Sequence, residues 1–289
     1  MTLTKDTHIL IVGLGVIGGG YASALSAKGY RVSCITKEQK DVNYALERGM
    51  ISYGTTCVEP ELVASAEMVI FALYPHVFIE WIEQYQHLLR PGAIITDVTG
   101  VKGSVVSRVQ GMLRSDVEFI SAHPMAGRES SGVEYSDDRV FRGANFIITP
   151  TEKNTPEAIA LCRRLGEELG FARISELSPE DHDVMVAFLS QLTHCIAITL
   201  MTCNEETPGM EQYTGDSFRD LTRIARINDA MWAELFLLNR DALLKQMDAF
   251  SAEFGKFRWL LASGRVEEMR QVMRTSTARR ALFDKPKME

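Results

Sequence analysis

The sequence predicts an α/β fold, in which a doubly wound domain with a parallel sheet over residues 1–176 is followed by an all-α domain over residues 177–289. Three observations predict it. Short apolar segments alternate with helical ones in the first part, a glycine-rich turn follows the first apolar segment, and nearly everything after Leu177 has helical periodicity. Strand–helix alternation at this spacing builds a parallel sheet with right-handed crossovers.

The elements of the first domain follow in a regular order. Strands are expected at residues 8–12, 31–35, 68–73, 93–97 and 117–122, with helices at 21–28, 41–48, 77–89 and 103–112 between them. A strand at 145–149, a helix at 156–169 and a short strand at 172–174 complete the domain. Ligands of such sheets lie outside the carboxyl ends of the strands. Residues 73–75, 97–102 and 123–129 should therefore line one crevice together with the glycine turn.

The second domain is predicted from apolar periodicity and one capping signal. Ser178 is a good N-cap, with Pro179 at the first helical position. Helices are expected at residues 184–203, 218–227, 230–254 and 266–283. The segment 184–203 is apolar on nearly all sides, which predicts a helix buried on most sides. Such a helix in a small domain indicates the core of a homodimer.

Composition narrows the possible partners. The net charge of −7 and the absence of a Lys/Arg block argue against nucleic acid. No apolar run is expected to reach the ~18 residues that cross a membrane, and no signal peptide is expected before the first strand. We therefore expect a cytoplasmic protein with no membrane partner. The five cysteines lack metal-type spacing, which predicts free buried thiols and no metal site.

The turn Gly13-Leu14-Gly15-Val16-Ile17-Gly18 predicts a dinucleotide-binding site, because GxGxxG at a strand-to-helix junction is specific. Gly13 permits the tight turn, Gly15 lets the backbone approach a pyrophosphate at the helix N-terminus, and Gly18 allows close packing. A purely structural turn is the alternative. The predicted cofactor-binding residues of this Rossmann-type domain are Gly13, Leu14, Gly15, Val16, Ile17, Gly18, Thr36, Lys37, Leu73, Tyr74 and Asp97.

The end of the second strand bears on the choice between NAD and NADP. NAD-binding domains usually place an acid there for the ribose 2′-hydroxyl, whereas this chain reads Thr36-Lys37-Glu38. A hydroxyl and an ammonium group suit a 2′-phosphate, which favours NADP over NAD. The alternative is that Lys37 is a solvated loop residue and Glu38 binds the ribose.

His123 is a candidate for taking up a proton. It follows the apolar run 117–122, and Pro124 and Gly127 indicate a turn just beyond it. A histidine at that place can take a proton near neutral pH, because its unperturbed pKa is about 6.5. The alternative is a strand end followed by a solvated turn.

The helical domain offers a second histidine and a pair of arginines. His194 stands on an apolar helix, where a lone histidine is more often a core residue than a functional one. Arg219 and Arg223 are i, i+4 neighbours, and arginine suits bidentate binding of a carboxylate. A salt-bridged surface helix is the alternative. Asp220 can hold Arg223, and Trp232 is either core or a pocket wall.

Several motifs occur in a characteristic order. They are Gly-Leu-Gly-Val-Ile-Gly-Gly near the N-terminus, Asp-x-x-x-Val-Lys at 97–102, His-Pro-Met-Ala-Gly-x-Glu at 123–129, Ser-Pro-Glu-x-His-Asp at 178–183 leading to Ser190 and His194, and Phe-Arg-Asp-x-Thr-Arg-Ile-Ala at 218–225 with Trp232. Together they resemble the prephenate/arogenate dehydrogenase family of tyrosine biosynthesis, over nearly the whole chain. A β-hydroxyacid dehydrogenase has a similar layout but would be expected to carry a catalytic lysine in its helical half.

The resemblance implies oxidative decarboxylation of prephenate or arogenate with hydride transfer to NAD(P), giving 4-hydroxyphenylpyruvate or tyrosine. It implies that His123 is the base on the ring hydroxyl, that Arg223 binds a substrate carboxylate and that His194 orients the substrate. The supporting residues that it implies are Glu129 and Asp220, which would position Arg223, and Trp232, which would close the pocket. Nicotinamide chemistry needs no metal.

Two positions depart from the family pattern. Family members often carry a serine where this chain has Gly100, so that Thr99 or a water molecule would have to supply the hydroxyl. Asp216 lies in an altered glycine-rich stretch, where an acid would favour the amino group of arogenate. Two alternatives stay open: an oxidoreductase on a related cyclohexadienyl substrate, and a non-catalytic dinucleotide-binding regulator.

Overall fold

The computed structural model describes residues 3–126, 132–204 and 208–284, and the chain divides into two compact units. The first unit comprises residues 1–240 and the second residues 241–289. The domain boundary predicted at residue 177 falls inside the first unit and stays a prediction.

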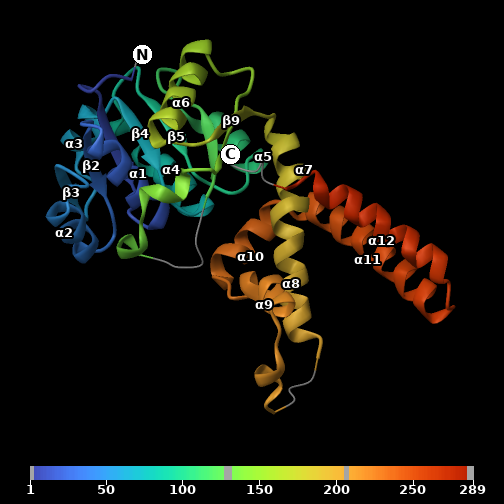
Figure 1. The fold of residues 1–289 in the computed structure, drawn as a ribbon. Coiled ribbons are helices and arrows are strands. Elements are labelled where there is room, and N and C mark those ends of the chain that lie inside the picture. Colours follow the sequence, from blue (N-terminus) through green and yellow to red (C-terminus); the bar gives the residue numbers. More distant parts are fainter. Residues whose placement is uncertain (1–2, 127–131, 205–207, 285–289) are drawn as a thin grey trace. The chain divides into compact units, whose positions relative to one another are not determined.

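A parallel sheet of six strands forms the centre of the first unit (Figure 1). Its order is β3 (Tyr53–Thr55), β2 (Arg31–Ile35), β1 (His8–Val12), β4 (Met68–Phe71), β5 (Ile94–Asp97) and β6 (Glu118–Phe119). The intervening helices are α1 (Val16–Ala27), α2 (Gln39–Glu47), α3 (Pro60–Ser65), α4 (Pro75–Tyr85) with the short η1 (Gln86–Leu88), and α5 (Gly103–Met112). The strand order reverses between β1 and β4, where doubly wound sheets bind their ligands. The predicted Rossmann-type fold is confirmed.

Local sequence explains most of these elements. Strands β1 and β4 are continuous apolar runs because both of their faces are buried. Helix α1 begins at Val16, five residues before its predicted start, because the glycine turn itself opens the helix. The sequence-based prediction misses β3 and α3, which are too short to show a clear apolar period.

A second sheet of three strands contains His123. Strand β7 (Ser121–Met125) pairs antiparallel with β8 (Asn145–Thr149), which pairs parallel with β9 (Arg173–Glu176). The single strand predicted at 117–122 is wrong, because β6 ends at Phe119 and the chain then enters β7 in the other sheet. His123 therefore lies inside a strand, opposite Ile147, and not on a turn after one.

The segment between β7 and β9 covers the first helix and then returns to the sheet. Two short helices, η2 (Val133–Tyr135) and η3 (Asp138–Phe141), pack against α1. Helix α6 (Pro156–Leu169) follows β8 as predicted. The Thr155 hydroxyl accepts a hydrogen bond from the backbone N–H of Ala158, and Gly170 ends the helix with φ of 85°.

One long apolar helix runs through α7 (Pro179–Val186), a π-helical stretch η4 (Ala187–Leu192) and α8 (Thr193–Thr202). Ser178 caps it as predicted. Its predicted burial on most sides is wrong for the single chain, since Val184 and Phe188 are about half exposed. By length and composition alone, residues 179–202 could cross a membrane, with 28% of the most apolar 18-residue window buried. The expectation that no apolar run reaches that length is therefore wrong.

Shorter helices complete the first unit: η5 (Met210–Tyr213), α9 (Asp216–Thr222), η6 (Arg223–Ala225) and α10 (Asp229–Leu238). The second unit contains α12 (Val266–Ala281) and all of α11 (Arg240–Ala262) except its first residue. The helix predicted over 230–254 is thus two helices that meet at Asn239. All five cysteines are free, as predicted, but only Cys34 and Cys162 are buried.

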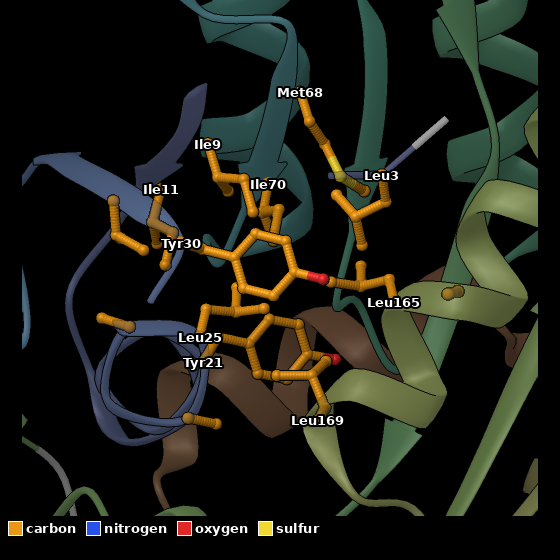
Figure 2. Packing of buried hydrophobic residues seen from close by; sticks show 14 of the residues in the cluster. Leu3, Ile9, Ile11, Tyr21, Leu25, Tyr30, Met68, Ile70, Leu165 and Leu169 are labelled. Carbon is orange, nitrogen blue, oxygen red and sulfur yellow. The ribbon is translucent and has the colours of Figure 1, made fainter. Parts of the chain in front are cut away.

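The main apolar core lies on the face of the sheet covered by α1 and α6 (Figure 2). Figure 2 labels ten of its members: Ile9, Ile11, Met68 and Ile70 from the sheet, Tyr21 and Leu25 from α1, Leu165 and Leu169 from α6, and also Leu3 and Tyr30. A second cluster, with Phe71, Phe78 and Trp81, packs under α4 and α5. Alternate residues of β1 and β4 belong to the two clusters, which therefore lie on opposite faces of the sheet.

Candidate active site

The glycine turn has the geometry that a dinucleotide needs. Gly13 has φ of 97°, and a Cβ there would overlap the carbonyl oxygen of Ala72. A Cβ on Gly18 would overlap the carbonyl oxygen of Gly13. Gly15, by contrast, is the N-cap of α1 without a side-chain cap, and a Cβ there would meet nothing within 4 Å. The open N-terminus of α1 and the space at Gly15 fit a pyrophosphate.

The other predicted cofactor residues differ in burial and in how close they lie to this turn. The side chain of Leu14 is buried in the core, so only its backbone can face a ligand. Leu73 lies against Gly13, 2.8 Å from the position of a Cβ there. Thr36 is buried and its N–H donates to the Thr55 carbonyl (3.1 Å), whereas Lys37 is exposed.

The turn between β4 and α4 is also held by helix α10. Asn228 donates a hydrogen bond from its amide to the Tyr74 hydroxyl (3.1 Å). The carboxylate of Glu234 accepts hydrogen bonds from the backbone N–H of His76 (2.7 Å) and from its ring Nδ1 (2.8 Å). Helix α10 is thereby fastened to the edge of the sheet where the cofactor is predicted to bind.

Asp97, at the end of β5, forms a buried ion pair with Lys102. Its carboxylate lies 2.8 Å from the Nζ of Lys102, and both side chains are fully buried. It also accepts hydrogen bonds from the Ser121 hydroxyl (2.6 Å) and the N–H of Ala122 (3.2 Å). Lys102 donates a further hydrogen bond to the Ala122 carbonyl (2.7 Å). Asp97 and Lys102 thus anchor the residue that precedes His123.

Thr99 and Gly100 follow β5 and bear on whether a hydroxyl of this chain lies beside His123. The Thr99 hydroxyl is buried, where it contacts the Asp97 carboxylate and the Val101 carbonyl (3.0 Å). It is therefore turned away from the site and does not replace the family serine. Gly100 lies beside His123, because a Cβ at Gly100 would stand 3.9 Å from His123 Nε2.

His123 contacts a second histidine that the sequence-based prediction assigns no role. The Nδ1 of His123 lies 2.8 Å from the Nε2 of His182, whose own Nδ1 lies 2.8 Å from the Asp183 carboxylate. Desolvation lowers the pKa of His123 well below 6.5, and the neighbouring His182 and Lys102 lower it further. The ring of His123 is therefore neutral at pH 7.

Helix α10 contacts both α8 and the segment that follows β5. Trp232 stacks on His194 of α8, with ring centroids 3.7 Å apart and planes 30° apart. His194 Nδ1 donates to the Ser190 carbonyl one turn earlier (2.8 Å). Leu235, three residues after Trp232 and so on the same face, lies 3.6 Å from the Cβ position of Gly100.

The remaining predicted residues lie on or outside helix α9. Arg223 begins η6 and is exposed, and the ion pair of α9 joins Arg219 to Asp216 (2.9 Å) and not Asp220 to Arg223, within the part of the chain that the structure describes. Asp216 has 93% of its side chain exposed. Glu129 lies outside the described residues. Asp220 and Arg223 form no ion pair with each other within the described ranges, and the network predicted around Arg223 stays a prediction.

Four residues that the prediction left without a role belong to the site: Lys102, His182, Asp183 and Leu235. Lys102, His182 and Asp183 all belong to motifs recognised in the sequence. By sequence alone, however, His182 resembles a solvated residue at a helix start, because acidic residues flank it in the first turn of the helix. Nothing local indicates a partner 59 residues away. No group of three His, Cys, Asp or Glu residues that could hold a metal ion occurs in the described ranges.

The chain is similar to one family along most of its length. Residues 21–175 match the family model described as prephenate dehydrogenase, nucleotide-binding domain, and residues 178–275 match prephenate dehydrogenase, dimerization domain. A prephenate dehydrogenase of Bacillus subtilis is 31% identical over 96% of this chain and 76% of its own length. A cyclohexadienyl dehydrogenase of Zymomonas mobilis is 32% identical over 90% of each chain.

Solved structures agree. Prephenate dehydrogenase from A. aeolicus, in complex with hydroxyphenyl propionate and NAD+, has a TM-score of 0.90 at 29% identity and covers 98% of this chain and 100% of that one. Synechocystis arogenate dehydrogenase has a TM-score of 0.82 at 25% identity, over 96% of this chain and 100% of that one.

Proposed function

This chain belongs to the prephenate dehydrogenase family, and from that membership we propose that it oxidatively decarboxylates prephenate, transferring a hydride to NAD(P) and giving 4-hydroxyphenylpyruvate. The observation that carries the proposal is the match to both domain models along the chain. It is supported by the A. aeolicus relative, whose complex holds an aromatic acid together with NAD+.

His123 is the base in this proposal. Its Nε2 accepts the proton of the ring hydroxyl, while Arg223 binds a substrate carboxylate and His194, against Trp232, orients the ring. The bound nicotinamide supplies hydride acceptance at the hydroxyl-bearing carbon. The ring carboxylate leaves as CO2, its bonding electrons make the ring aromatic, and the phenolate oxygen takes the proton back from His123.

Steady-state kinetics with prephenate and arogenate, each with NAD and NADP, test the proposal. We expect the nicotinamide fluorescence of the reduced cofactor to rise when prephenate is added. Silence with both substrates and both cofactors would favour the non-catalytic dinucleotide-binding regulator instead.

Arogenate is the second candidate substrate. The Synechocystis arogenate dehydrogenase and the cyclohexadienyl dehydrogenase of Zymomonas mobilis both cover the chain well, which supports it. Asp216 adds little support, because its carboxylate is exposed and engaged with Arg219. A higher kcat/KM for arogenate than for prephenate would make arogenate the preferred substrate.

We propose NADP as the preferred cofactor because Lys37 is exposed just after β2, where the ribose 2′-substituent of a bound dinucleotide lies. Lys37→Ala is expected to raise the KM for NADP by roughly tenfold, the size of one lost contact to a charged group, and to leave that for NAD unchanged. Lys40→Ala, an exposed lysine one turn later, is the matched control. Equal changes for both cofactors would contradict this preference.

The structure leaves space for the missing serine hydroxyl at Gly100. Gly100→Ser should be tolerated, because the nearest atoms to the new Cβ are those of Leu235, at 3.6 Å. The hydroxyl would be within reach of His123 Nε2 and the substrate hydroxyl. One added hydrogen bond is worth about 0.5–1.5 kcal/mol, so kcat/KM is expected to rise by roughly two- to tenfold. Gly100→Ala is the control that adds the Cβ alone, and an equal gain in both variants would contradict the role of the hydroxyl.

We also propose a homodimer formed through the helical part of the chain, in the cytoplasm. The matched family model is described as a dimerization domain, and the exposed apolar side chains on α7 to α8 include Val184, Phe188, Leu189 and Met201. Burying these side chains against a second copy would remove apolar surface from water. Light scattering is expected to give twice the mass of the chain, and Phe188→Glu to shift the population toward monomer.

A further inference from the structure

The side chains of β7 and α7 form a continuous line from a carboxylate to the proposed base. Asp183 Oδ1 contacts His182 Nδ1 at 2.8 Å, and His182 Nε2 contacts His123 Nδ1 at 2.8 Å. The two rings meet edge to face, with planes 64° apart and centroids 5.1 Å apart. The His182 side chain has no exposed surface.

The Asp183 carboxylate at the end of this line determines which nitrogen of each histidine ring carries a hydrogen. A carboxylate only accepts, so the hydrogen between His182 and Asp183 is on His182 Nδ1. A neutral His182 then has a bare Nε2, which accepts from His123 Nδ1. His123 Nε2 is left without a hydrogen, as a base must be. A cationic His182 would instead donate to His123 and place the hydrogen of His123 on Nε2. Burial lowers the pKa of His182, which keeps it neutral at pH 7.

Asp183 is itself held firmly in place. Its two carboxylate oxygens accept hydrogen bonds from the backbone N–H groups of Lys102 and Gly103, at 2.8 Å each, which open helix α5. Its carbonyl accepts a hydrogen bond from the side-chain amide of Asn239 (2.9 Å). The Asp183 carboxylate is therefore fixed relative to α5, whose neighbour Lys102 anchors the residue before His123.

The other ring nitrogen of His123, Nε2, lies on the side of Gly100. Nε2 stands 3.9 Å from the position of a Cβ on Gly100, at the carboxyl edge of the sheet. The line Asp183–His182–His123 thus ends at Nε2, the atom that takes the proton of the substrate hydroxyl in the proposed function.

We propose that His182 and Asp183 are positioning residues that hold His123 in the tautomer with hydrogen on Nδ1, so that its bare Nε2 takes the substrate proton. The proposal rests on the proposed function, in which His123 is the base. When Nε2 takes the proton, the cationic ring of His123 keeps its hydrogen bond to His182, and Asp183 stabilises the pair electrostatically. The hydroxyl O–H bond breaks and an N–H bond forms at His123, with no further reactant needed.

Nitrogen-15 spectra of the full-length enzyme with labelled histidine test the tautomers without any substitution. They are expected to show hydrogen on Nδ1 of both His123 and His182 at pH 7, with His123→Asn and His182→Gln used to assign the signals. Hydrogen on Nε2 of either ring would overturn the proposal, whether or not the enzyme turns over prephenate.

Substitutions test the effect on the reaction. His182→Leu removes the acceptor and is expected to lower kcat by about 10²-fold or more. His182→Gln, whose amide oxygen can still accept from His123, is expected to recover part of that loss. Asp183→Asn is expected to lower kcat and to shift the acid limb of the plot of kcat/KM against pH. The other ionisable groups that surround the pair of histidines are Lys102 and Asp97. His8→Leu is the control for removing a buried hydrogen-bonded histidine, since His8 bonds Ser33 (2.6 Å) away from this edge.

A double variant separates this role from a structural one. If His182 acts through His123, then adding His182→Leu to His123→Asn should lower the residual kcat no further. An additional loss equal to that of the single variant would overturn the proposal. Full activity in His123→Asn would instead overturn the assignment of His123 as the base in the proposed function. If His123→Asn is inactive but His182→Leu alone keeps an unchanged kcat, only the positioning role is overturned.

Discussion

Replacing His123 with Asn is expected to lower kcat for prephenate by about 10²–10⁴-fold, the usual contribution of a positioned general base. Asparagine keeps a polar side chain of similar size but cannot accept the hydroxyl proton near neutral pH. Cofactor binding should be nearly unaffected, because the glycine turn that is proposed to bind it lies on β1 and α1. Steady-state kinetics and a fluorescence titration with the reduced cofactor measure the two effects separately.

The pH profile gives this prediction its internal control. Since desolvation and the neighbouring His182 and Lys102 hold the pKa of His123 well below 6.5, the ring is neutral in the free enzyme at pH 7. The kcat/KM of the unaltered enzyme should be flat near pH 7 and fall only when the pH drops below 6.5 toward the lowered pKa. His123→Asn should lack that acid limb. A variant that keeps both its kcat and its acid limb would show that another group is the base.

Replacing Lys102 with Met is expected to lower the free energy of unfolding by about 3–5 kcal/mol, because it leaves the buried carboxylate of Asp97 without its cation. Both side chains of the pair are fully buried, at 2.8 Å. The substitution also removes the donor to the Ala122 carbonyl and so loosens the strand that carries His123. Urea denaturation followed by circular dichroism measures the change.

Arg108→Met is the matched control for the Lys102 substitution. Arg108 forms an ion pair of similar length with Glu83 (2.9 Å), but both side chains are largely exposed. Exposed pairs contribute up to about 1 kcal/mol, so this variant should be nearly as stable as the parent. Combining Lys102→Met with Asp97→Asn removes both buried charges and should recover part of the loss. Equal costs for Lys102→Met and Arg108→Met would contradict the importance of burial.

Parts of the fold whose signals are local were predictable from sequence. Helix α6 has its predicted bounds, because Thr155 caps it, Pro156 is its first residue and Gly170 ends it. Helix α5 also has its predicted bounds, although no side chain caps it. The central strands β1 and β4 were visible as continuous apolar runs. The turn at Gly13 to Gly18 was recognisable because the tight turn and close packing exclude a Cβ.

The partners of distant segments were not predictable in this way. An apolar run at 117–122 indicates buried strand, but the pairing of β7 with β8, which places His123 in a second sheet, depends on residues far along the chain. The helix over residues 179–202 was recognised as apolar, whereas its exposure on one side depends on what packs against it.

By itself, the sequence determined the Rossmann-type fold, the glycine turn and His123 as the candidate base, because glycine geometry, apolar period and residue chemistry are local properties. Only the tertiary structure decided what His123 touches. Its contact with His182 joins β7 to α7, and the open place at Gly100 is bounded by Leu235 of α10 and by His123 itself. Hydrogen bonds between such segments depend on orientation and burial, which the order of residues along the chain does not reveal.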